Sequence, residues 1–144
     1  GLPAAMGAQA AAMDKQVWCV SGDGSFQMNV QELMTCVQEK WPIKILLLDN
    51  AYLGMVRQWQ EQFYEKNYSG VNMQNPDFVK LANSFHIPAA KATSVEELKE
   101  AVKTAQDTDG PFLIHAIVPK EENVFPMVPP QTSLSETMYY PKTE

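Results

Sequence analysis

A carboxylate lies between two glycines at residues 22–24, and a serine follows directly. The apolar run before this segment predicts a strand, and the apolar spacing after it predicts a helix. Glycines at such a turn let the backbone approach a phosphate, and the N–H groups of the helix start face the anion. Asp23 would repel a phosphate unless a cation lay between them. Residues 22–25 therefore predict a phosphate site that includes Mg²⁺.

A second polar pair, Asp49-Asn50, follows the next apolar run, and residues 25–48 separate it from the first motif. Consecutive parallel strands end at the same edge of a sheet, so we expect the two motifs to lie close together. Asn50 offers an amide oxygen, and Mg²⁺ prefers oxygen ligands. Each motif alone is most often a simple turn. Together, at two consecutive strand ends, they favour a diphosphate–metal site.

Alternating helices and strands must position these motifs. Their order (α, β, α, β, α, α, β, α, β) predicts an α/β fold with an open, mostly parallel sheet and helices on both faces. We predict this domain over residues 1–120 and an extended, proline-rich tail over 121–144. Asn75-Pro76 resembles an N-cap followed by the first residue of a helix. The other predicted helices are 3–13, 26–38, 53–65 and one after Ser94, and the strands are 16–21, 43–48, 89–93 and 112–118.

Composition narrows the possible functions. The 144 residues suffice for one domain, and the net charge of −6 argues against nucleic-acid binding. No apolar stretch is long enough for a membrane span. Cys19 and Cys36 lack metal-ligand spacing, so we expect reduced core residues, as in the cytosol. His86 and His115 have no partners at ligand spacing and are predicted to be structural.

Longer strings resemble the acetolactate synthase (acetohydroxyacid synthase) catalytic subunit. The resemblance rests on residues 22–29, on 46–50, on 53–56 and on Gln58-Trp59. It implies the C-terminal thiamin-diphosphate-binding (pyrophosphate-type) domain of that enzyme. It also implies a place in branched-chain amino-acid biosynthesis, which makes valine, isoleucine and leucine. It is weakest in the last dozen residues.

The resemblance assigns site residues by position. Asp23 and Asn50 would bind Mg²⁺ through their side chains, and Tyr52 would bind it through its backbone carbonyl. Many relatives have Asn at the position of Asp49, so an extra negative charge there would tune metal affinity. Trp59 would line the substrate pocket and favour 2-ketobutyrate as second substrate, although a lone Trp is more often a packing residue. The residues assigned to the cofactor are Gly22, Asp23, Gly24, Ser25, Asn50, Tyr52, Leu53, Gly54 and Met55.

The resemblance also implies what this chain lacks. The family's catalytic glutamate belongs to the N-terminal pyrimidine-binding domain of a neighbouring subunit, so no catalytic residue is assigned here and the isolated chain is expected to be inactive. The full enzyme would be a cytoplasmic, bacterial homodimer or tetramer. It would bind FAD and a regulatory small subunit, and would act on pyruvate and 2-ketobutyrate.

Two alternatives remain open. Another thiamin-diphosphate carboligase or decarboxylase would share Asp23 and Asn50 without needing Gln58-Trp59. A non-catalytic, flavodoxin-like module would use residues 22–25 for a different phosphate, and would bind it without a metal.

Overall fold

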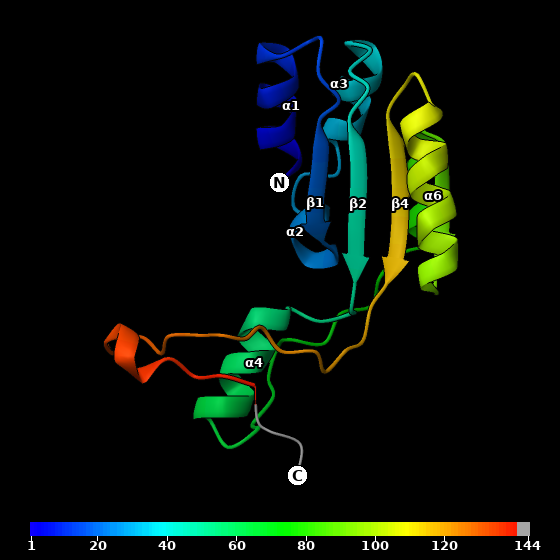
Figure 1. Cartoon of the computed structure of the whole chain (residues 1–144). Helices are drawn as coiled ribbons and strands as arrows, with labels where there is room; N and C mark the ends of the chain where they lie inside the picture. Colours follow the sequence, from blue (N-terminus) through cyan, green and yellow to red (C-terminus); the bar gives the residue numbers. More distant parts are fainter. Residues whose placement is uncertain (141–144) are drawn as a thin grey trace.

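Four parallel strands form one sheet in the order β1-β2-β4-β3 in the computed structural model, which describes residues 1–140 (Figure 1). The two central strands are mostly buried, as expected for apolar strands enclosed by helices. The predicted α/β fold with a parallel sheet is therefore confirmed. The strands are β1 (Trp18–Gly22), β2 (Lys44–Asp49), β3 (Ala89–Ala92) and β4 (Phe112–Ile117).

Helices cover both faces of the sheet. On one face a buried cluster joins residues of four helices, such as Met6, Leu33 and Phe78, to strand residues such as Ile45. On the opposite face Ala101 and other residues of one helix pack on β4. Each buried large apolar side chain contributes about 2 kcal/mol. The four helices of the first face are α1 (Leu2–Ala11), α2 (Asp23–Gln27), α3 (Glu32–Gln38) and α5 (Phe78–Ser84), and the second face is covered by α6 (Val95–Asp107).

Helix α4 (Gly54–Phe63) and the tail lie beyond the carboxyl ends of the strands (Figure 1). The tail is attached to this helix through Gln58, whose amide nitrogen donates to the Val124 carbonyl at 3.0 Å and whose oxygen accepts from Val124 N–H at 2.8 Å. Up to residue 140, where the description of the tail ends, it contains a short 3₁₀ helix, Leu134–Glu136. The last four residues of the predicted tail lie outside the described residues.

One predicted helix is wrong in its extent. Residues 26–38 form the end of a short helix α2 (Asp23–Gln27), a turn and helix α3. Phe26 on α2 and Leu33 and Cys36 on α3 enter the same core. The apolar spacing therefore continues across the break, and it cannot reveal the turn between the two helices.

The predicted N-cap at Asn75 is also wrong. Helix α5 begins after Asp77, whose carboxylate accepts hydrogen bonds from the N–H groups of Val79 and Lys80, both at 3.1 Å. Asp is as good an N-cap as Asn, so the sequence alone did not distinguish them. The side chain of Asn75 therefore does not cap this helix and can form other hydrogen bonds.

Within residues 1–140, no helix is both long and apolar enough to cross a bilayer.

Candidate functional site

A cavity of about 640 Å³ lies at the carboxyl ends of β1 and β2. Its size is typical of sites for small organic ligands and cofactors. All nine residues predicted to contact the cofactor line it. These are Gly22, Asp23, Gly24, Ser25, Asn50, Tyr52, Leu53, Gly54 and Met55, and they are joined by Leu48, Val56, Val118, Pro119 and Glu122.

Asp23 begins helix α2 and is buried. Its Oδ1 accepts from Gly24 N–H at 2.9 Å, and its Oδ2 accepts from Ala51 N–H at 2.9 Å and from Asn75 Nδ2 at 2.6 Å. Burial raises the pKa of the Asp23 carboxyl above its ordinary value, although the bonds from Asn75 and Gly24 oppose this shift. A cation in the cavity would stabilise the negative charge of the Asp23 carboxylate and thereby favour its ionised form.

Asp49 ends β2 beside Asp23 and shares two of its donors. Its Oδ1 accepts from Asn75 Nδ2 at 2.7 Å and from Ala51 N–H at 3.0 Å, and its Oδ2 lies 2.7 Å from His115 Nε2. His115 Nδ1 is buried and has no hydrogen-bond partner among residues 1–140, so the tautomer with the proton on Nε2 satisfies the ring best. Burial would raise the pKa of Asp49, but the bonds from His115 and Asn75 outweigh it and lower that pKa.

Asn50 follows Asp49 and lines the cavity. Its Oδ1 accepts from Tyr52 N–H at 3.1 Å, which leaves one lone pair of that oxygen for another partner. A Cβ atom on Gly54 would lie 2.9 Å from Asn50 Nδ2, closer than such atoms can approach. Glycine at residue 54 is therefore required to make room for the amide of Asn50.

The oxygen atoms that face this cavity are suitable ligands for a hard cation. A carboxylate and an amide oxygen, from Asp23 and Asn50, converge on one cavity with glycine-flanked backbone N–H groups at the start of a helix. Among the described residues, no three His, Cys, Asp or Glu side chains gather as a metal cluster. A metal here would therefore need oxygen ligands from a bound phosphate, which is how Mg²⁺ is commonly held.

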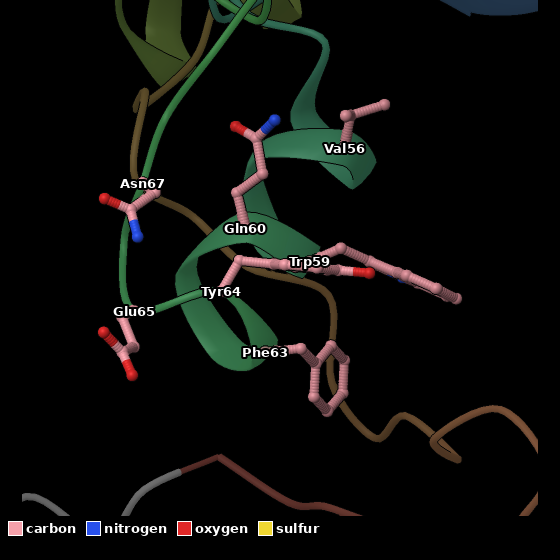
Figure 2. A pocket seen from close by; sticks show the side chains of 7 residues that line it. All are labelled: Val56, Trp59, Gln60, Phe63, Tyr64, Glu65 and Asn67. Atoms are coloured by element: carbon pink, nitrogen blue, oxygen red, sulfur yellow. The ribbon is translucent and has the colours of Figure 1, made fainter.

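Trp59 lies elsewhere, in a second cavity of about 540 Å³ along α4 (Figure 2). Its ring meets that of Phe63 edge to face, with centroids 5.8 Å apart. Val56 lines both cavities, so the two spaces adjoin at the first turn of α4. Trp59 is 37% exposed, which is more than a core packing residue would show.

The sequence did not reveal two members of the site, Asn75 and His115. Both lie far along the chain from the residues they contact. His115 was predicted to be structural because no ligand-type residue stood near it in sequence. The only available signal was its position on a buried parallel strand next to the one that ends in Asp49.

Fold and site together define a class: an α/β domain with a ligand-sized cavity at the carboxyl ends of its parallel strands, the usual place for ligands in such sheets. Residues 1–116 match the family described as thiamine pyrophosphate enzyme, C-terminal TPP binding domain, and the chain belongs to this family.

Relatives and a solved structure agree with this assignment. The chain is 49% identical over 139 residues to the acetolactate synthase isozyme 2 large subunit of Escherichia coli. This alignment covers 96% of the chain and 25% of that protein. The chain is 47% identical over 137 residues to the chloroplastic acetolactate synthase 3 of Brassica napus, covering 90% and 21%. The thiamine diphosphate-dependent 4-hydroxybenzoylformate decarboxylase of Rhodococcus jostii superimposes with a TM-score of 0.78 at 32% identity, covering 85% of the chain and 23% of that structure.

The resemblance to acetolactate synthase stated from the sequence is thus confirmed. The chain spans about a quarter of the length of the curated relatives it matches.

Proposed function

We propose that this chain is the cofactor-binding domain of an acetolactate synthase and that it binds the diphosphate of thiamin diphosphate through Mg²⁺. The observation that carries the proposal is the single cavity that gathers all nine residues assigned by the resemblance. Asp23 and Asn50 bind the metal through side-chain oxygens, and Tyr52 binds it through its carbonyl. Ser25 donates its N–H group to the diphosphate, and Gly24, whose own N–H donates to Asp23 Oδ1, lets the backbone approach it closely.

When bound, thiamin diphosphate supplies a carbon nucleophile and an electron sink for decarboxylation. This chain's part is to hold and orient the cofactor. Leu53, Gly54 and Met55 form the wall of the cavity next to the metal residues. Trp59 lines the adjoining cavity along α4. There it contacts the second keto acid and favours 2-ketobutyrate over pyruvate.

The rest of the reaction requires groups outside this chain. The substrates are pyruvate and 2-ketobutyrate, and the proton-transferring glutamate comes from the pyrimidine-binding domain of a neighbouring subunit. The whole enzyme is a cytoplasmic homodimer or tetramer that also binds FAD and a regulatory subunit. Within this chain, residues 1–120 bind the cofactor and the following tail closes over the active site.

Calorimetric titration with thiamin diphosphate tests the proposal. Wild-type protein should bind with Mg²⁺ and fail to bind in EDTA, and Asp23→Ala should fail in both conditions. Asp14→Ala is the matched control, because Asp14 is an exposed carboxylate remote from the cavity. Equal binding with and without metal would refute the magnesium model and favour the flavodoxin-like phosphate module.

The structural match to a decarboxylase makes a second test necessary. Products formed from pyruvate and 2-ketobutyrate by the whole enzyme separate the two activities. Acetohydroxybutyrate supports the synthase, and aldehyde as main product supports a decarboxylase. The Trp59→Leu variant should shift the product ratio towards acetolactate.

A further inference from the structure

The side-chain amide of Asn75 stands between two buried carboxylates. Its nitrogen donates to Asp23 Oδ2 at 2.6 Å and to Asp49 Oδ1 at 2.7 Å, so both of its hydrogens are used. Two carboxylates that share donors in this way repel each other unless the donors between them compensate. Asn75 and the Ala51 N–H are the donors common to both.

The orientation of the amide is fixed by a third contact. Gln27 Nε2 donates to Asn75 Oδ1 at 3.0 Å. A flipped amide would direct Oδ1 at the oxygens of both Asp23 and Asp49, and it would place two donor groups, from Gln27 and Asn75, against each other. Because Asp77 caps helix α5, Asn75 has no capping role that would explain its position.

Counting lone pairs shows what this arrangement leaves free. Each carboxylate oxygen accepts about two hydrogen bonds. On Asp23, Oδ2 already accepts two and Oδ1 accepts one, from Gly24 N–H, so one acceptor position remains on Oδ1. On Asp49, Oδ1 accepts two bonds, and Oδ2 is bonded to His115 and keeps one acceptor position, but Asp49 is not among the residues that line the cavity.

We propose that Asn75 is a positioning residue for the metal: it holds Asp23 so that Oδ1, and not Oδ2, is presented to the cation, and it compensates the repulsion between Asp23 and Asp49. The inference rests on the proposed function and deepens it. Groups that orient a metal ligand through hydrogen bonds typically change metal affinity roughly 10- to 100-fold when removed. We expect an effect of that size for Asn75.

Mn²⁺ serves as the probe, because its EPR spectrum reports free and bound metal directly. Binding is measured with thiamin diphosphate present, for wild type, Asn75→Ala and Asp23→Ala. Asn83→Ala is the matched control, since Asn83 is exposed on helix α5. The melting temperature of each variant without metal separates loss of folding from loss of binding.

Asn75→Ala should weaken Mn²⁺ binding roughly 10- to 100-fold, while Asn83→Ala binds like wild type. Gln27→Ala gives a second route if Asn75→Ala does not fold: it frees the amide to rotate, and it should weaken binding in the same direction by less. In an Asp49→Asn background the effect of Asn75→Ala should shrink, because one of the two charges has been removed.

Asn75→Ala that binds Mn²⁺ within about twofold of wild type, whatever its melting temperature, would overturn the inference and leave the proposed function intact. If Asn75→Ala does not fold, a folded Gln27→Ala variant that binds Mn²⁺ as tightly as wild type would overturn the inference in the same way. Wild-type protein that shows no metal-dependent cofactor binding would instead overturn the proposed function and this inference with it.

Discussion

Adding one methyl group at Gly54 should disable the metal site while the fold is retained. The new Cβ would lie 2.9 Å from Asn50 Nδ2, and ordinary contacts begin at 3.4 Å, so the two atoms must separate by about half an ångström. The only nearby atom in conflict is the Asn50 amide, at the end of a short side chain. Displacing it also lengthens the 3.1 Å bond between Asn50 Oδ1 and Tyr52 N–H.

The expected magnitudes follow from these contacts. Losing the bond to Tyr52 costs about 1 kcal/mol, and replacing glycine by alanine in a helix returns up to about 1 kcal/mol. Stability should therefore change by less than about 1 kcal/mol. A binding group must be held within about 0.5 Å of its productive position, so metal affinity should fall roughly tenfold or more.

Two measurements on Gly54→Ala and Gly7→Ala test this prediction. Mn²⁺ titration in the presence of thiamin diphosphate gives the metal affinity, and thermal unfolding gives the stability. Gly7 lies in helix α1, and a Cβ there meets no atom within 4 Å. This control should gain up to about 1 kcal/mol of stability and bind as wild type does. Wild-type affinity in Gly54→Ala would refute the claim that Asn50 requires glycine at residue 54 for its position.

Further predictions concern the core and the tail. Lys44 is buried and its ammonium donates to two loop carbonyls at 2.6 and 2.5 Å, so Lys44→Ala should lower the free energy of unfolding by about 2 kcal/mol in urea titrations. Burial raises the pKa of Cys36 to about 11, so the stability due to its neutral thiol should be full below pH 9.0 and vanish as the pH rises through about 11, measured against Cys36→Ala. Thiol reagents at neutral pH should label Cys19 and Cys36 only after denaturation, and early labelling would contradict their burial. Gln58→Leu should release the tail and speed hydrogen exchange at Val124 N–H, and unchanged exchange would show that other contacts suffice.

Local patterns in the sequence were enough to predict the strands and the two polar motifs at residues 22–25 and 49–50, and the family resemblance added the other cavity residues. Apolar runs that end next to Gly22 and Asp49 identify two strands, and parallel pairing then brings their ends together. The same reasoning placed Asn50 near Asp23, whereas Gly54 was assigned to the cavity by the family resemblance. These predictions succeed because the determining residues are neighbours in sequence or follow consecutive paired strands.

The bonds made by Asn75 and His115 were not predictable in this way. Asn75 forms its bonds across a long loop, and its neighbour Asp77 is an equally good N-cap. His115 reaches Asp49 only because β4 is inserted between β2 and β3, a strand order that apolar periodicity does not specify. Hydrogen-bond partners that depend on strand order require the three-dimensional structure.

The attachment of the tail to α4 has an evolutionary consequence. At residue 124 Gln58 bonds to the main-chain N–H and carbonyl, while the Val124 side chain is 59% exposed; the one side-chain partner of Gln58 on the described part of the tail is Met127 Sδ, at 3.5 Å. Every residue except proline offers the same two groups. The tail can therefore exchange side chains at residue 124 across related sequences and keep its path, whereas Gln58 on the helix must be retained.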